Sequence, residues 1–201
     1  TNDEMIPVNV YIGVDIAATA TNTSDFQVIM VIGIDKEKNR YVLEYFRERI
    51  PTFDLPQIII DMANKYTPIR RATIETVAAQ EMVRDMVTRL AHSDKRLIPG
   101  IFKGVKPPGG IKKEDRLETT LGPIVNSKKL FIRRSMTELV DEFFEHPFPR
   151  HDDLMDGLYY ADYYAKAPSS SRMKKSEYKN SSKKKAIGGK VYNWMTGLRM
   201  S

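Results

Sequence analysis

Short apolar runs alternate along the chain with stretches in which apolar residues recur every three or four positions, and this pattern predicts an α/β fold. Three strands are expected first, over 8–17, 26–35 and 40–49, with a tight turn over 35–39. Two more strands are expected over 70–76 and 97–102, and a short extended piece over 130–132. Short turns make the first three strands an antiparallel meander, whereas strands separated by helices join a sheet in parallel. We therefore expect a mixed sheet of five or more strands with helices on both faces.

The helical stretches carry their own start signals. One helix is expected to begin near Asp54, and others over 78–91, 112–121, 135–145 and 152–165. Ser135 and Glu138 have the spacing of a capping box at the start of the fourth helix. Asp152 directly precedes the last helix, where an aspartate commonly acts as the N-cap.

The charge of the chain is divided unevenly between two parts. Residues 167–201 contain nine basic residues and one acid, Glu177, whereas the preceding residues contain 23 basic and 25 acidic residues. The segment after Pro168 is also rich in Ser and Lys and poor in apolar residues, which is typical of a linker or a disordered tail. We expect one globular domain over 1–167 and a basic tail over 168–201.

Several classes of protein are disfavoured by composition. The chain contains no cysteine, which excludes a disulfide framework and a thiolate zinc site. No apolar run reaches the roughly 18 residues needed to cross a bilayer, and no secretory signal pattern is visible. We expect no membrane partner.

Acidic residues stand at positions where a globular fold seldom places them without a purpose. Asp15 interrupts an apolar strand, and Glu75 ends another. If those two strands pair, the two acids become neighbours. Asp153 and Asp156 lie three residues apart at the start of the last helix and so share one of its faces. Carboxylates that converge from distant segments form a site for a hard divalent cation.

The second concentration of charge is positive. Residues 103–134 contain nine basic residues and three acids, which indicates either a solvated surface or a zone that holds a polyanion beside the acids. The basic residues that we expect to contact DNA phosphates are Lys103, Lys106, Lys112, Lys113 and Arg116. Contacts of this kind provide affinity and position without reading sequence.

Three of these segments together resemble a known family. They are Ile12–Ala17 around Asp15, Thr73–Thr76 around Glu75, and His151–Leu158 (HDDLMDGL), in that order. Over roughly residues 8–165 the chain resembles the nuclease domain of tailed-bacteriophage terminase large subunits, which belongs to the ribonuclease H-like nucleases. The segment 112–117, followed by 121–123 and 130–131, looks like the basic helix of that family.

This resemblance implies a metal-dependent endonuclease that cuts concatemeric viral double-stranded DNA during genome packaging, with low sequence specificity. Asp15, Glu75 and Asp153 would be catalytic and would hold two Mg²⁺ ions, for which Mn²⁺ would substitute, and Asp156 would complete the metal shell. His151 and Asp152 are secondary candidates, the latter also as a simple helix cap. In the full-length protein the implied partners are an ATPase domain, the portal and the small terminase subunit, in the cytoplasm of an infected bacterial host.

Three other functions remain open at this point. The Asp153–Asp156 spacing also resembles Holliday-junction resolvases, which share the fold. The segment 12–15 resembles the first phosphate loop of actin-like and sugar-kinase proteins, but the second Gly-rich phosphate loop of that group is missing. The basic tail is compatible with a non-catalytic DNA-docking module, which would leave the acids unexplained. A Walker phosphate loop is absent, so this chain would contain no packaging ATPase.

Overall fold

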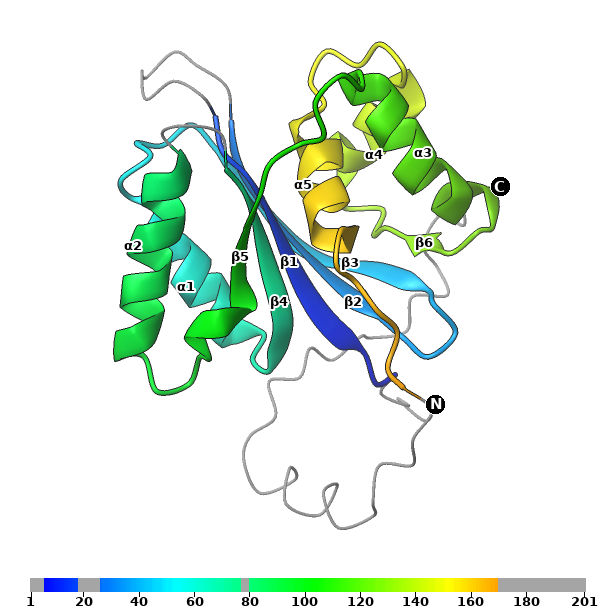
Figure 1. The fold of residues 1–201 in the computed structure, drawn as a ribbon. Helices are drawn as coiled ribbons and strands as arrows, with labels where there is room; N and C mark the ends of the chain where they lie inside the picture. The colour runs from blue at the N-terminus through cyan, green and yellow to red at the C-terminus, as the bar shows by residue number, and fades with distance from the viewer. Residues whose placement is uncertain (1–5, 18–25, 77–79, 170–201) are drawn as a thin grey trace.

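The computed structural model describes residues 6–17, 26–76 and 80–169 (Figure 1). In these ranges the strands are β1 (Asn9–Asp15), β2 (Gln27–Ile34), β3 (Arg40–Glu48), β4 (Ile69–Glu75), β5 (Phe102–Val105) and β6 (Leu130–Phe131). The helices are α1 (Leu55–Lys65), α2 (Gln80–Ser93), α3 (Lys113–Asn126), α4 (Thr137–Glu145) and α5 (Asp153–Asp162), with one 3-10 turn, η1 (Pro99–Ile101).

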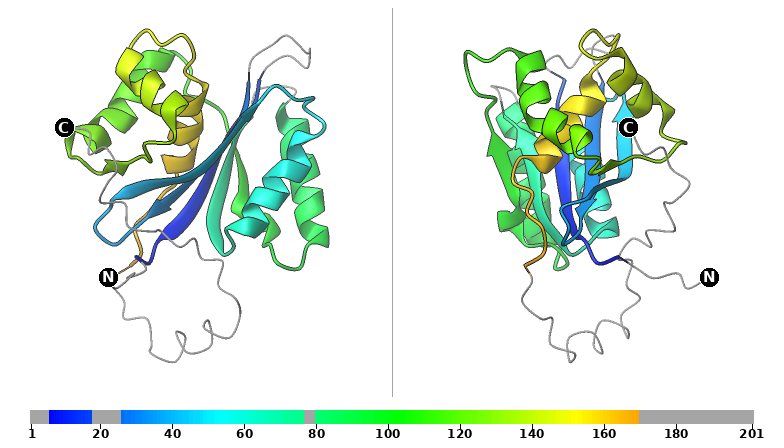
Figure 2. Two further views of the ribbon diagram at one scale, coloured as in Figure 1. Left: turned by 180° about the vertical axis from the view of Figure 1, so that it is seen from behind. Right: turned by 90° about the vertical axis from the view of Figure 1, so that its right-hand side faces the viewer.

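The strands form one mixed sheet in the order β5-β4-β1-β2-β3-β6. β1, β2 and β3 pair antiparallel, whereas β4 pairs with β1, β5 with β4 and β6 with β3 in parallel. The predicted meander followed by parallel strands is thus confirmed. α1 and α2 cover one face of the sheet, and α3, α4 and α5 cover the other (Figures 1 and 2).

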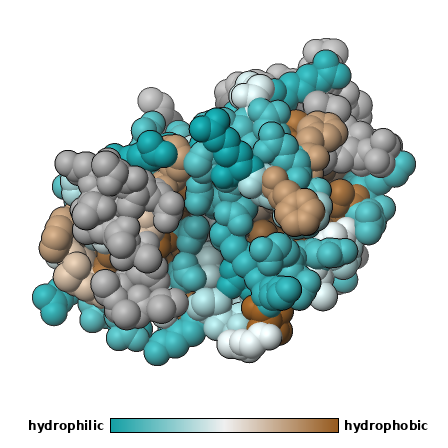
Figure 3. All heavy atoms as spheres, turned by 90° about the horizontal axis from the view of Figure 1, so that it is seen from above, coloured by the Kyte–Doolittle hydropathy of each residue, from teal (hydrophilic) through white to brown (hydrophobic). Residues whose placement is uncertain are grey.

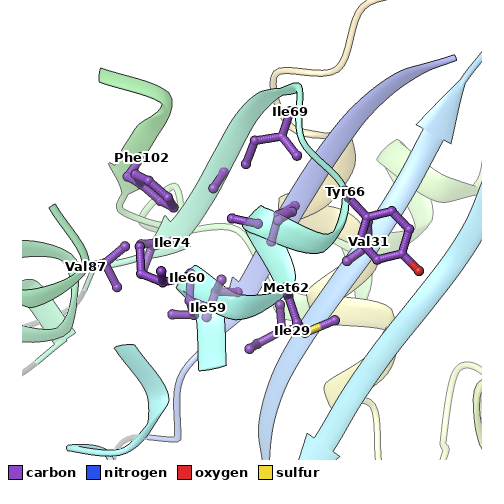
Figure 4. Packing of buried hydrophobic residues seen from close by; sticks show 14 of the residues in the cluster. Ile29, Val31, Ile59, Ile60, Met62, Tyr66, Ile69, Ile74, Val87 and Phe102 are labelled. Carbon is purple, nitrogen blue, oxygen red and sulfur yellow. The ribbon is translucent and has the colours of Figure 1, made fainter. Parts of the chain in front are cut away.

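Each face of the sheet has its own apolar core. On the first face, Ile29 and Ile74 pack with Ile59 of α1 and Val87 of α2 (Figure 4). On the second face, Met30 is among the residues that pack with Leu154 and Leu158 of α5. Every residue of β2 is buried, which explains why its sequence is a continuous apolar run rather than an alternating one.

The turn between β2 and β3 forms as its sequence predicts. The Asp35 carboxylate accepts hydrogen bonds from the backbone amides of Glu37 at 2.8 Å and Asn39 at 2.9 Å, and from the Tyr41 hydroxyl at 3.0 Å. Lys38 takes the left-handed conformation with φ 64°. The short aspartate side chain therefore closes the hairpin.

Two local predictions are wrong. The strand expected over 97–102 begins only at Phe102, because Pro99 and the bond from the Ile101 amide to the Ile98 carbonyl make the preceding residues a 3-10 turn. The capping box at Ser135 does not form, because α4 begins one residue later, with Met136 at the N-cap position. Glu138 instead accepts hydrogen bonds from Tyr45 and Arg47 of β3.

The end of the described chain is fastened to the start of β1. The Tyr11 hydroxyl donates to the Lys166 carbonyl oxygen and accepts from the Lys166 amide, both at 3.0 Å. The Asn9 side chain donates to the same carbonyl oxygen at 3.0 Å. The predicted basic tail lies almost entirely outside the described residues. Within those residues, no helix combines the length and apolar character needed to cross a membrane.

Candidate active site

Two carboxyl groups end neighbouring parallel strands. Asp15 is the last residue of β1 and Glu75 the last of β4, and the pairing of Val14 with Ile74 places them side by side. Burial of the Asp15 carboxyl, a hydrogen bond to Glu75, and the negative charges of Asp156 and Glu75 raise the pKa of Asp15 well above its ordinary value. Without a cation, a proton therefore joins the two acids.

α5 brings a third acid to this pair. A Cβ atom at Gly13 would overlap the carbonyl oxygen of Gly157 and the amide nitrogen of Ala161, so the backbones of β1 and α5 are in direct contact. Asp156, in the first turn of α5, lies close enough for its charge to act on the Asp15 carboxyl. Asp156 is itself only 3% exposed. Asp15, Glu75 and Asp156 thus meet at one end of the sheet.

Asp153 faces a different neighbour. Its Oδ2 lies 3.4 Å from Nη2 of Arg47 on β3 and 3.9 Å from Nδ1 of His151. Burial raises the pKa of Asp153, and the charges that act most on it are those of Arg47, Lys113 and Asp152. Of the two acids expected from α5, the structure therefore places Asp156, not Asp153, beside Asp15.

The two secondary candidates have distinct surroundings. Asp152 occupies the N-cap position of α5, but its side chain makes no capping hydrogen bond. Its Oδ1 lies 2.8 Å from Nζ of Lys113 instead. The His151 ring meets the edge of the Phe26 ring, with centroids 5.4 Å apart, and its side chain remains 41% exposed.

The five basic residues expected to contact DNA fall into two groups. Lys113 and Arg116 of α3 both pair with the Asp156 carboxylate, so in this structure their charges neutralise an acid of the site. Lys103, Lys106 and Lys112 are exposed, and only Lys106 has an acid nearby in the described ranges, Glu81 at 3.8 Å. The molecular face seen from above is mainly hydrophilic, with separate apolar patches (Figure 3).

Sequence comparison gives no relative, whereas structure comparison does. No known family profile matches the chain, and no well-characterised protein is significantly similar in sequence. The large terminase nuclease from thermophilic phage G20c, solved with bound zinc, has a TM-score of 0.58 at 16% identity, over 81% of this chain and 86% of that chain. The yeast mitochondrial Holliday junction resolvase Ydc2 has a TM-score of 0.52 at 12% identity, over 79% of this chain and 78% of its own.

This is the ribonuclease H-like fold. The expected fold class is thereby confirmed. In this ribonuclease H-like domain, Asp15 and Glu75 end two strands at the centre of the sheet, and α5 packs across the first of them.

The acids of this ribonuclease H-like domain suit a hard divalent cation. All the donors are carboxylate oxygens, the ligands that Mg²⁺ and Mn²⁺ prefer. The proton shared by Asp15 and Glu75 occupies a place that a cation would fill with a better balance of charge. Within the described ranges, no three acidic or histidine side chains already form a metal-binding group, so the carboxylates have to draw together around an ion.

One residue that supports the site was not expected from the sequence. Glu142 of α4 is buried, and its carboxylate accepts hydrogen bonds from the backbone amides of Leu154 at 3.4 Å and Met155 at 2.9 Å. It therefore caps the N-terminus of α5 in place of Asp152. Burial raises the pKa of Glu142 to about 8. The available signal was an acid three residues after Leu139, on the apolar face of α4.

A second such residue is Tyr160 of α5. Its hydroxyl is buried without a hydrogen-bond partner that meets distance and angle criteria among the described residues. Burial and the nearby charge of Glu75 raise its pKa. The hydroxyl is therefore a neutral donor held next to the Asp15–Glu75 pair, and nothing in the Tyr159–Tyr160 sequence distinguishes it from an ordinary core tyrosine.

Proposed function

We propose that this chain is a divalent-metal-dependent DNA endonuclease. The observation that carries the proposal is the meeting of Asp15, Glu75 and Asp156 at one end of the sheet, where two acids already share a proton. The fold supports it, because both structural neighbours described above are proteins that act on DNA by name, a terminase nuclease and a junction resolvase.

The site residues have separate roles in this proposal. Asp15 and Glu75 would hold Mg²⁺ or Mn²⁺ from the sheet, and Asp156 would do so from α5. Two such ions, when bound, activate the attacking water and stabilise the leaving 3′-oxygen. The exposed Lys103, Lys106 and Lys112 would hold the DNA backbone without reading its bases. Asp153 remains a predicted ligand, since its present partner is Arg47.

The specific biological role that we favour is genome packaging in a tailed bacteriophage. The domain would cut concatemeric double-stranded viral DNA in the cytoplasm of the infected host, as the nuclease part of a terminase large subunit. An ATPase domain, the portal and the small subunit would be its partners. Support comes from the sequence resemblance over 8–165 and from the TM-score with the phage nuclease.

A junction resolvase is the second candidate, because the resolvase Ydc2 matches almost as well. The two functions differ in the preferred substrate. A resolvase cuts a four-way junction far better than a linear duplex of the same sequence, whereas a packaging nuclease cuts both. Cleavage of labelled junction and linear duplex at equal concentration decides between them.

The nuclease activity itself is tested on supercoiled plasmid with Mg²⁺, Mn²⁺ or excess chelator. We expect cleavage with either ion and none with chelator. Asp15→Asn and Glu75→Gln should each lower the rate more than about a hundredfold, since outer-shell partners of a metal alone contribute about 10- to 100-fold. Asp141→Asn, which changes an exposed acid of α4, should cut at the wild-type rate. Equal cutting in chelator would refute metal dependence.

The two α5 acids are ranked by a second pair of variants. Because Asp156 lies beside Asp15 and Asp153 beside Arg47, Asp156→Asn should lower the cleavage rate more than Asp153→Asn. Thermal unfolding of both variants separates loss of activity from loss of fold. A dead Asp153→Asn together with an active Asp156→Asn would restore the ligand set expected from sequence.

A further inference from the structure

A lysine lies among the acids of the site. Lys113 is the first residue of α3, and its Nζ contacts Oδ1 of Asp152 at 2.8 Å and Oδ2 of Asp156. The other oxygen of Asp156, Oδ1, lies 3.0 Å from Nη2 of Arg116. Both oxygens of the Asp156 carboxylate are therefore already in contact with a cation.

These two cations differ in how firmly they are held. The Arg116 side chain is 11% exposed, and its guanidinium lies over the Tyr159 ring, 4.8 Å from the centroid. Arg116 is thus fixed by packing as well as by charge. The Lys113 side chain is 37% exposed, stacks on no ring in the described ranges, and ends in a single flexible ammonium group. Of the two, Lys113 can leave without disturbing the interior.

The charges of the site also favour an exchange. With one proton between them, Asp15 and Glu75 carry one negative charge, and Asp152 and Asp156 add two more. Lys113 and Arg116 offset most of this. The Lys113 charge reaches the Asp15 carboxyl as well, because it lowers the pKa of that group. A divalent ion bound by the same acids would repel the ammonium at short range.

We propose that Lys113 is an exchangeable counter-ion that competes with the divalent ion for the Asp156 carboxylate. In the ion-free protein the ammonium neutralises Asp152 and Asp156; ion binding displaces it toward solvent, where a DNA phosphate becomes its partner. This inference rests on the proposed function, since it needs an ion at these acids. It also explains why a residue expected to contact DNA is engaged with acids in the absence of DNA.

The first test is calorimetric titration of Mn²⁺ into the chelator-treated protein without DNA, so that no turnover contributes. Lys113→Gln should bind Mn²⁺ about tenfold more tightly than wild type, a modest share of the unscreened interaction of such close charges. Lys113→Arg keeps the charge and should stay near wild type. Lys112→Gln is the matched control: it removes the same charge from the neighbouring exposed lysine, which contacts no carboxylate in the described ranges, and should change the affinity less than twofold.

The second test uses the unmutated protein, so it does not depend on the folding of a variant. An amine-acetylating reagent should label Lys113 slowly without ions, because its ammonium is paired with two carboxylates. Saturating Mg²⁺ should raise the ratio of Lys113 to Lys112 labelling, measured by mass spectrometry, severalfold. Lys112 provides the internal reference for reagent concentration and pH.

The possible outcomes separate this inference from the function on which it rests. Absence of Mn²⁺ binding to the wild-type protein would refute the proposed metal site itself. Binding that is equally tight in wild type, Lys113→Gln and Lys112→Gln, with a labelling ratio unchanged by Mg²⁺, would leave the metal site standing and overturn the exchange. Tighter binding in Lys113→Gln alone, with the raised labelling ratio, would support it.

Discussion

At the scale of single residues, the shared proton at Asp15 ties the stability of the domain to pH. The folded chain binds this proton more tightly than the unfolded chain, for which the pKa is the ordinary 3.8. The folded state therefore holds more protons than the unfolded state between pH 3.8 and the raised folded pKa. Without divalent ions, the free energy of unfolding should fall as pH rises through this window.

Replacing the acid should remove this dependence. In chelator at pH 7.5, we expect Asp15→Asn to unfold at a higher temperature than wild type, by about 2–4 °C for each kcal/mol of repulsion relieved. Mg²⁺ should raise the unfolding temperature of wild type but not of the variant. Asp141→Asn should follow wild type in both conditions. A variant that is less stable than wild type in chelator would show that Asp15 supports the fold rather than straining it.

The same scale shows how far sequence could lead. Asp15 and Glu75 could be found because each ends an apolar strand and the topology makes those strands neighbours. The choice between Asp153 and Asp156 could not be made, because it depends on how α5 is rotated against the sheet. That rotation follows from the contact between Gly13 and Gly157, a tertiary feature that the spacing of the acids does not contain.

At the scale of elements, the strands and helices with strong apolar periodicity were predicted to within a few residues, and the failures occur where periodicity is short. The segment 97–102 is apolar enough for a strand, but Pro99 cannot donate a backbone bond and a turn wins. α3 continues to Asn126, beyond the expected end at 121, through Gly122 and Pro123. Tertiary contacts of Leu121 and Ile124 outweigh those helix-breaking residues.

Glu142 links α4 to α5, and its substitution should affect stability in a pH-dependent way. Its folded pKa of about 8 exceeds the ordinary 4.5, so the folded state holds the extra proton and the free energy of unfolding falls between pH 4.5 and 8. Glu142→Gln should flatten this slope. Glu142→Ala should cost about 1–3 kcal/mol at pH 6, because two buried amides of α5 lose their acceptor.

Chemical denaturation at pH 6 and pH 8 measures both effects. Glu118→Gln, which changes an exposed acid of α3, is the control and should keep the wild-type slope. An unchanged slope in Glu142→Gln would mean that the carboxyl is ionised in the folded protein across this range.

At the scale of the whole molecule, the domain ends where it began. Lys166 is bonded to Tyr11 and Asn9 near the start of β1, whereas Asp15 lies at the other end of that strand. We therefore expect a chain ending at Ala167 to retain the fold and metal-dependent cleavage. Removal of the nine basic residues beyond it should weaken non-specific DNA binding. The slope of log K against log salt should become shallower by about 0.9 for each phosphate that the protein no longer neutralises.

Binding isotherms at several salt concentrations and plasmid cleavage, both on the truncated and the full chain, measure these effects. Normal DNA binding with no cleavage in the truncated protein would show that residues 168–201 belong to the catalytic fold, and that the predicted boundary is wrong.

The backbone contact between β1 and α5 restricts which sequences can encode this site. Since main-chain atoms set the distance from helix to strand, the surrounding core can exchange Ile, Val and Leu without moving Asp156 away from Asp15. A single methyl group at Gly13 has no such freedom, whereas Gly100 has no atom within 4 Å of the position of a Cβ. In a saturation library assayed for DNA cleavage, position 13 should admit glycine alone and position 100 should admit alanine readily. The most constrained position after the acids would then be one that has no side chain.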